Sequence, residues 1–239
     1  YAFSECGNLS SATFTGNAPD TFGECVFVNT AENFTIYYYE HSDGWTAGTW
    51  TAPDQTEYKT VKLETTPTIV ASADCGDDIT WTLYSNGLLT LTGSGDMWDY
   101  TDNEEAPSPF IEYREMIKTI SIADGITSIG STAFVDCDNL TEVEFPASVT
   151  TIGSRSFQNC DSLTAIALNN GLTHLKDHAF EFCKNLAAVS LPDTLKYIGE
   201  KAFAECEALT AIALPASLEE IGANPFCLCK SLATITVAS

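Results

Sequence analysis

Apolar residues recur with a fixed period of 23 residues in the second half of the chain. In each repeat a phenylalanine is followed three residues later by a cysteine and six residues later by a leucine. The repeats carry Phe134, Cys137 and Leu140; Phe157, Cys160 and Leu163; Phe180, Cys183 and Leu186; Phe203, Cys206 and Leu209; and Phe226, Cys229 and Leu232. A gapless period of this length predicts a solenoid in which each repeat forms one coil.

Each coil contains two short extended segments and one tight turn. The pattern Leu-x-x-Val/Ile-x-Leu, as in residues 163–168, alternates apolar and polar positions and predicts a strand with one buried face. A proline often ends this strand because proline cannot donate to a ladder. A Thr-x-Ile-Gly pattern predicts a second extended segment, and Ala-Phe-x-x-Cys predicts a helical or 3₁₀ turn with the phenylalanine inward. One coil buries too little apolar surface to offset the entropy of ordering it, so we expect the coils to stack.

The string IGSTAFVDCDNLTEVEFPASVTTIG at residues 129–153 resembles the BspA-like leucine-rich repeats of bacterial cell-surface proteins. The resemblance covers residues 117–239 and extends to residues 1–16. In residues 1–16 the matching positions are Phe3, Cys6, Leu9 and Phe14. The resemblance implies secretion and display at the bacterial surface. Both ends of the sequence fall inside a repeat, so we expect a fragment of a longer array.

We therefore predict a β-rich α/β solenoid. It is a leucine-rich repeat with 23-residue coils of short parallel strands and short helical or 3₁₀ turns, and an additional β-rich segment separates two repeat blocks. The stretch ITWTLYSNGLLTLTG predicts a β-hairpin with a type I′ turn at Asn86-Gly87. The predicted parts are the end of an upstream array (1–16), its β-rich C-terminal cap (17–63), a linker (64–74), a hairpin that caps the next array (75–116) and about five coils (117–239).

Charge narrows the classes of partner. The chain carries 33 acidic and 10 basic residues, a net charge of −23, and no Lys or Arg precedes Lys59. Binding to nucleic acid requires clustered cations, so we expect no nucleic-acid partner. No run of 18 apolar residues occurs, so we expect no membrane insertion by these residues. The acidity is instead expected to keep a long apolar stack in solution.

The cysteines suggest a core ladder more than a disulfide framework. Six of the nine, at positions 6, 137, 160, 183, 206 and 229, share one place in the coil, and there we predict reduced, buried thiols. Cys25, Cys75 and Cys227 lie outside this register, and a disulfide among them stays open. None of the patterns places an activating His or cation beside a cysteine, so we predict no catalytic thiol.

Two other groups of residues resemble metal sites only in part. His174 and His178 are spaced like a zinc pair, but the intervening Glu of a metalloprotease motif is absent and the segment is predicted to be extended and solvent-facing. Acidic residues gather at Asp74, Asp77 and Asp78, and at Asp96, Asp99, Asp102, Glu104 and Glu105. They lack the spacing of a calcium loop, so solvated loops are favoured over bound Ca²⁺. We expect no metal, no cofactor and no enzymatic activity.

The best candidate for a binding surface is the outer face of the main strands. Between the buried positions of each strand lie two residues that must point away from the core. These candidate ligand-face residues are Thr119, Ser121, Glu142, Glu144, Ala165, Ala167, Ala188, Ser190, Ala211, Ala213, Thr234 and Thr236. Small side chains admit a partner's backbone or a flat ring, although simple tolerance of Ala on a strand is the competing interpretation.

Two functions follow from this pattern. The first is a non-catalytic, adhesin-like surface protein whose face binds an extracellular host or bacterial protein or glycan. The alternative is a structural spacer that displays another domain.

Overall fold

The computed structural model describes residues 3, 6–7, 9–14, 26–27, 29–30, 34–39, 45, 48–51, 57–63, 67–101 and 106–238. The chain divides into two compact units, Tyr1–Pro67 and Thr68–Ser239. The division falls inside the stretch 64–74 that we expected as a linker. Each unit is described by itself.

The first unit is built on a four-stranded sheet with the order β1-β2-β4-β3. Its strands are β1 (Ser11–Phe14), β2 (Thr35–Tyr39), β3 (Gly48–Thr51) and β4 (Glu57–Leu63). β1, β2 and β4 are parallel, with Ser11 opposite Thr35 and Thr35 opposite Lys59, so each step along the sheet is 24 residues. Only β3 runs antiparallel, beside β4. The expected boundary between residues 16 and 17 therefore does not separate two sheets.

Aromatic side chains fill the core of the first unit. Phe27, Phe34, Trp50 and Tyr58 are buried together with Ile36. The rings of Phe3 and Phe27 stack with centroids 5.4 Å apart, again across a step of 24 residues. This ring stacking resembles that of the second unit, described below.

The second unit opens with β5 (Ile69–Tyr84) and the antiparallel β6 (Leu88–Met97). β5 begins at Ile69, so residues 69–74 of the expected linker belong to this cap. Its first half folds back beside its second half, because the Ser72 hydroxyl donates to the Trp81 carbonyl at 2.7 Å and the Ser85 N–H donates to the Thr68 carbonyl at 2.8 Å.

The hairpin turn between β5 and β6 is not the predicted type I′ turn. That turn needs positive φ at both Asn86 and Gly87, but only Gly87 has it, at 90°. The Gly87 N–H donates to the Tyr84 carbonyl at 2.9 Å. The connection is therefore a turn over residues 84–87 whose last residue is left-handed, which only a glycine adopts without cost.

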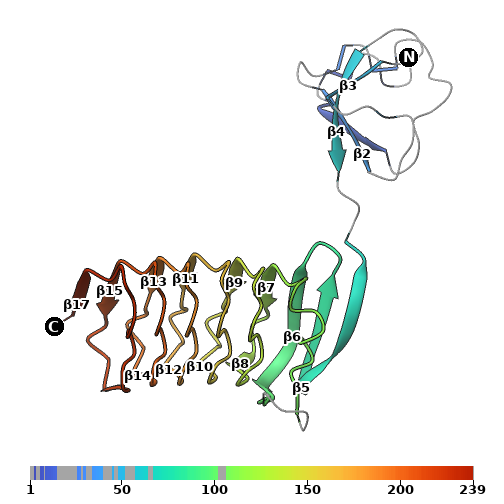
Figure 1. The fold of residues 1–239 in the computed structure, drawn as a ribbon. Helices are drawn as coiled ribbons and strands as arrows, with labels where there is room; N and C mark the ends of the chain where they lie inside the picture. Colours follow the sequence, from blue (N-terminus) through green and yellow to red (C-terminus); the bar gives the residue numbers. More distant parts are fainter. Residues whose placement is uncertain are drawn as a thin grey trace. The chain divides into compact units, whose positions relative to one another are not determined.

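Beyond the cap, two ladders of parallel strands run along the solenoid (Figure 1). The main ladder contains β7 (Thr119–Ile122), β9 (Glu142–Glu144), β11 (Ala165–Ala167), β13 (Ala188–Ser190), β15 (Ala211–Leu214) and β17 (Thr234–Val237). The second contains β8 (Ile126–Ile129), β10 (Thr151–Ile152), β12 (His174–Leu175), β14 (Tyr197–Ile198) and β16 (Glu220–Ile221). Paired residues such as Ala165 and Ala188 are 23 positions apart, which confirms the predicted repeat solenoid.

One long strand starts both ladders. The first residues of β6 pair with β7, and Gly95 near its end pairs with Ile126 of β8. Gly93 marks the bend between these two pairings, with φ of 115°. A Cβ atom at Gly93 would lie 1.9 Å from the Asp78 carbonyl oxygen, so glycine is required there. The hairpin thus acts as a template for two faces of the solenoid.

The third side of each coil, which we call the turn face, comprises residues 131–136 and the equivalent residues 154–159, 177–182, 200–205 and 223–228. We expected a helical or 3₁₀ turn here, but the described residues form turns and no helix. Two residues per coil have positive φ, between 51° and 64°. They are Thr132 and Asp136, Arg155 and Asn159, His178 and Phe182, Lys201 and Glu205, and Asn224 and Leu228.

The positive φ angles have a clear consequence for hydrogen bonding. Alternate N–H groups of the turn face point along the solenoid axis and donate to the next coil. In one coil the N–H groups of residues 155, 157 and 159 donate to the carbonyls of residues 177, 179 and 181 at 2.9–3.0 Å. A helix would instead satisfy its N–H groups within the coil and leave this side unpaired.

The core lies between the three sides. Phe110, Phe134, Phe157, Phe180, Phe203 and Phe226 form a continuous stack with centroids 4.7–5.8 Å apart. The array therefore begins in register at Phe110, earlier than the expected residue 117. Because every interior ring contacts a ring on each side, the apolar surface of one coil is buried mainly by its neighbours.

Replacing Lys201 by glycine tests the strain on the turn face. Lys201 has φ of 51°, and a left-handed residue other than glycine costs on the order of 1 kcal/mol. We expect Lys201→Gly to raise the free energy of unfolding by up to about 1 kcal/mol in urea denaturation. The control Ala187→Gly, at an exposed residue of negative φ, is expected to lower it by about 0.5–1 kcal/mol. Equal destabilisation by both variants would contradict this account.

Candidate binding face and cavities

The main ladder presents one continuous outer face, which we call the strand face. It comprises the twelve candidate ligand-face residues from Thr119 to Thr236 that the sequence predicted. In β9, β11 and β15 the outward residues are exposed while Val143, Ile166 and Ile212 between them are buried. Thr119 and Ser121 on β7 are half-buried, and the other ten are exposed. The parallel register aligns these residues in two rows along the array.

A shallow groove of about 640 Å³ lies on the strand face. Glu142, Ala165, Ala167, Ala188 and Ser190 line it, together with the backbone around them. The groove exists because methyl and hydroxymethyl side chains stand where larger side chains would fill the space. Its charge comes from Glu142, and Glu144 lies on the same strand.

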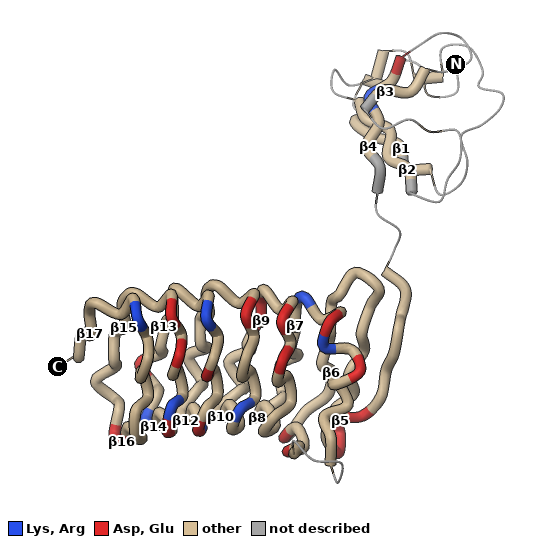
Figure 2. The backbone as a smooth tube through the Cα atoms, in the orientation of Figure 1, with Lys and Arg blue, Asp and Glu red and all other residues tan. Residues whose placement is uncertain are grey.

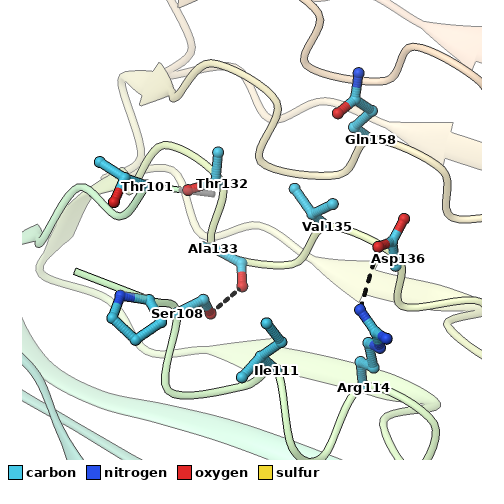
Figure 3. A pocket seen from close by; sticks show the side chains of 10 residues that line it. Thr101, Ser108, Ile111, Arg114, Thr132, Ala133, Val135, Asp136 and Gln158 are labelled. Carbon is cyan, nitrogen blue, oxygen red and sulfur yellow. Dashed lines mark hydrogen bonds and ion pairs between the residues drawn. The ribbon is translucent and has the colours of Figure 1, made fainter. Parts of the chain in front are cut away.

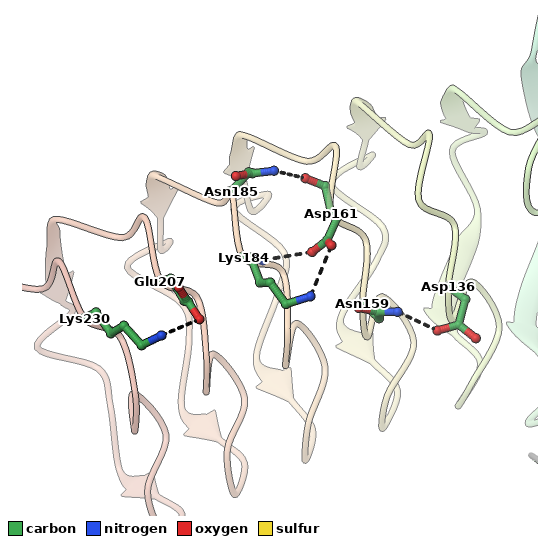
Figure 4. A network of polar contacts seen from close by, with 7 residues as sticks. All are labelled: Asp136, Asn159, Asp161, Lys184, Asn185, Glu207 and Lys230. Atoms are coloured by element: carbon green, nitrogen blue, oxygen red, sulfur yellow. Dashed lines mark hydrogen bonds and ion pairs between the residues drawn. The ribbon is translucent and has the colours of Figure 1, made fainter.

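Cations are distributed elsewhere on the solenoid. The strands of the main ladder contain no Lys or Arg. Four cations instead pair with an acid of a neighbouring coil or of the first coil (Figures 2 and 4). These pairs are Arg114–Asp136 at 3.2 Å, Lys184–Asp161 at 3.3 Å, Lys196–Glu219 at 2.9 Å and Lys230–Glu207 at 2.8 Å. Each exposed pair is worth less than about 1 kcal/mol, so they adjust register more than they stabilise.

A second cavity, of about 730 Å³, lies beside the turn face of the first coil (Figure 3). Segment 106–116 forms one wall with Ile111 and Arg114, and the first coil forms the other with Val135 and Asp136. Sequence analysis missed this cavity. The signal available was the departure of residues 106–116 from the repeat pattern, since a segment unlike a coil cannot cover the next coil as a coil does.

The two histidines do not form a metal pair. His174 is exposed, and its Nδ1 lies 2.9 Å from the Thr173 hydroxyl. His178 is half-buried, with Nδ1 2.9 Å from Glu181 Oε2, so the expectation that it faces solvent was wrong. Its left-handed backbone turns the side chain toward its own coil. Within the part of the chain that the structure describes, no three His, Cys, Asp or Glu side chains are placed to hold a metal ion.

The acidic residues of the cap hold the hairpin to the first coils. Asp77 accepts a hydrogen bond from the Trp98 indole at 3.0 Å, and Asp99 accepts one from the Ser131 N–H at 2.7 Å. Asp96 accepts one from Thr127 at 2.6 Å, and hydrogen bonds from Thr127 and Ser128 hold the pKa of Asp96 below its usual range. Asp102, Glu104 and Glu105 lie outside the described residues.

Membrane-spanning segments were also considered. Among the described residues there is no helix of the length and apolarity needed to cross a membrane.

The repeat itself identifies the family. The model of the BspA type leucine rich repeat region matches residues 110–237 in six copies. The chain belongs to this family. Its repeats build a scaffold of the kind found in bacterial surface repeat proteins, for which a binding or a structural role is consistent. No curated protein matches the chain significantly.

Several solved structures share this fold. A leucine-rich repeat protein from Eubacterium ventriosum is 24% identical, with a TM-score of 0.60, over 71% of this chain and 44% of that one. A leucine rich cell surface protein from Faecalibacterium prausnitzii is 26% identical, with a TM-score of 0.44, over 73% of this chain and 56% of that one. The pneumococcal vaccine antigen PcpA is 17% identical, with a TM-score of 0.43, over 71% and 48%. The chain thus spans about half the length of these proteins.

The cysteines of the BspA-type repeats form a ladder of thiol hydrogen bonds. The Sγ atoms of Cys160, Cys183, Cys206 and Cys229 donate to the carbonyls of Phe134, Phe157, Phe180 and Phe203 at 3.1–3.4 Å. Every described cysteine is free, and Cys25 lies outside the described residues. Cys6 is exposed, contrary to the prediction, since the chain has no coil before it to supply the covering carbonyl.

Burial also makes the ladder thiols unreactive. It raises the pKa of Cys137 to about 12, and raises that of Cys160 well above its ordinary value. Cys75 in the hairpin cap is likewise buried, which raises its pKa to about 12. Since the thiolate is the nucleophile, these residues are protonated and inert at neutral pH.

Alkylation of the native chain tests the thiol ladder. At pH 8 we expect iodoacetamide to modify Cys6 and Cys227, which are exposed and half-buried, while Cys137, Cys160 and Cys206 stay intact. All are expected to react after denaturation in urea. Peptide mapping by mass spectrometry, without reduction, gives the readout. Modification of Cys160 as fast as Cys6, or a disulfide within the ladder, would contradict the structure.

Proposed function

We propose that the strand face binds an extracellular protein or glycan, and that the chain acts as a non-catalytic binding module at the bacterial surface. The observation that carries the proposal is the groove lined by small side chains on an otherwise regular, exposed sheet. The location at the cell surface is part of the proposal and rests on the family to which the repeats belong.

The chemistry of the strand face favours binding over catalysis. Its outward side chains are those of Thr, Ser, Ala and Glu only. A hydroxyl becomes a nucleophile only beside a base, and no His, Lys or Cys lies in these strands. Small side chains, by contrast, let a partner approach the sheet closely, and the parallel register repeats the same contact from coil to coil.

Rigidity supports the same role. The strands of the face are held by parallel pairing and by a fully buried core, with Ile166 and Ile212 anchored beneath the Ala positions. A surface that is ordered before binding loses little conformational entropy on association. The two glutamates on β9 add negative charge at one part of the face, which favours a partner that carries a cation or hydroxyl donors there.

Substituting arginine into the groove tests the proposal. Binding partners are first identified by screening the whole chain against matrix proteins, mucins and glycans. The double variant Ala165→Arg/Ala211→Arg fills the face with two long side chains and is expected to weaken binding at least tenfold, by about 1.4 kcal/mol or more. Glu142→Ala/Glu144→Ala is expected to weaken it less, with an effect that shrinks at high salt.

Two exposed alanines outside the face provide the matched control. Ala147→Arg/Ala216→Arg adds the same charge and is expected to leave affinity unchanged. If binding survives both the arginine and the glutamate variants, the partner does not use the strand face. If the screen finds no partner while a neighbouring domain of the full-length protein keeps its activity, the spacer alternative is favoured.

A further inference from the structure

The cavity beside the first coil differs in origin from the groove on the strand face. It lies between segment 106–116 and the turn face, with a volume of about 730 Å³, inside the range of small-ligand sites (Figure 3). It shares no lining residue with the groove. What it presents can be deduced from the hydrogen-bonding pattern of the repeats.

Each interior turn face offers three carbonyls to the preceding coil, and all three are used. The carbonyls of residues 154, 156 and 158 accept from the N–H groups of residues 132, 134 and 136. The same threefold pairing recurs at residues 177, 179 and 181, at 200, 202 and 204, and at 223, 225 and 227. Complete pairing is therefore the rule of this surface.

The first coil breaks that rule at the cavity. The Ser131 carbonyl accepts from the Tyr100 N–H at 3.0 Å, and the Ala133 carbonyl accepts from the Ser108 hydroxyl at 2.6 Å. The third equivalent carbonyl is that of Val135, and no described residue donates to it. Val135 lines the cavity, so the cavity occupies the place of the missing third donor.

Planar polar side chains lie around this open carbonyl, and each is already held by a partner. Arg114 Nη1 donates to Asp136 Oδ2 at 3.2 Å, and Asp136 Oδ1 accepts from the Asn159 amide at 2.9 Å. Gln158 Nε2 donates to Glu181 Oε2 at 2.6 Å, which leaves the Gln158 carbonyl oxygen as an acceptor. Arg114 keeps further N–H donors. The cavity thus combines fixed donors and fixed acceptors.

One wall of the cavity is apolar. Ile111 projects from segment 106–116 with 53% of its surface exposed, although it is a large aliphatic residue. Ala133, Val135 and Pro107 continue this wall. An exposed isoleucine beside oriented polar groups is the arrangement that binds a molecule with one C–H face and polar groups around its edge.

We propose that this cavity binds a neutral saccharide of one or two sugar units. Vicinal hydroxyls both donate and accept, so they match the open Val135 carbonyl, the Gln158 oxygen and the Arg114–Asp136 pair together. The C–H face of the ring packs on Ile111. Asp136 balances the charge of Arg114, which disfavours an anion, and a single open carbonyl is too few to add a peptide strand, which pairs through several.

The full chain is tested with a stated panel of ligands. The neutral members are glucose, galactose, mannose, N-acetylglucosamine, maltose and lactose; sialic acid and tetraalanine represent an anion and a peptide. In methyl spectra with labelled isoleucine, we expect a neutral sugar to shift the Ile111 signal with a Kd of about 1 mM or tighter. The Ile166 methyl, beneath the strand face, is expected not to move.

Calorimetry on variants locates the site. Ile111→Asp removes the apolar wall, and Asp136→Asn keeps the shape and tolerates the left-handed backbone while removing the charge that holds Arg114. Each is expected to weaken sugar binding at least tenfold. Ile69→Asp, at an isoleucine with 64% exposure in the hairpin cap, is the matched control and is expected to bind as the unaltered chain does.

Three results would overturn the proposal: no sugar of the panel shifting the Ile111 signal, binding that is unchanged in both cavity variants, or tetraalanine or sialic acid binding at Ile111 in place of the neutral sugars. Ala165→Arg/Ala211→Arg is expected to leave sugar binding intact, so failure at the cavity and failure at the strand face are separable.

Discussion

Hydrogen bonding between successive coils on all three sides is the interaction on which the rest of the second unit depends. The main strands, the short second strands and the turn face each donate to or accept from the residue 23 positions away or close to it. The phenylalanine stack and the thiol ladder follow the same step inside the core. A coil removed from its neighbours would leave its backbone groups unpaired on every side, at a cost that its own apolar contacts do not offset.

The sequence predicted those parts of the fold that periodicity encodes. Alternating apolar residues located the strands of the main ladder and their outward positions, and the cysteine register predicted a buried ladder for five of its six members. The turn face escaped prediction because residues such as Phe182 and Leu228 carry a left-handed backbone that their side chains do not favour. Pairing with the next coil enforces that conformation, and tertiary pairing of this kind is absent from local propensity.

The first unit shows a related lesson. Its strands Thr35–Tyr39 and Glu57–Leu63 are aromatic or charged, so they did not match the leucine pattern and were predicted as a cap. Their parallel step of 24 residues shows that backbone register can continue where side-chain similarity has faded. Both candidate sites arise from this interplay. The groove lies where the repeat carries only small side chains, and the cavity lies where a segment that is not a coil meets the first coil.

Deleting one whole coil tests the dependence on stacking most directly. Removing residues 165–187 takes out 23 residues and joins Thr164 to Ala188 in register. The account predicts a folded chain whose urea m-value and free energy of unfolding both fall, roughly in proportion to the surface that one coil buries. Removing only residues 165–175 breaks the register and is predicted to unfold the array. An unchanged free energy after the whole-coil deletion, or equal tolerance of both deletions, would contradict the account.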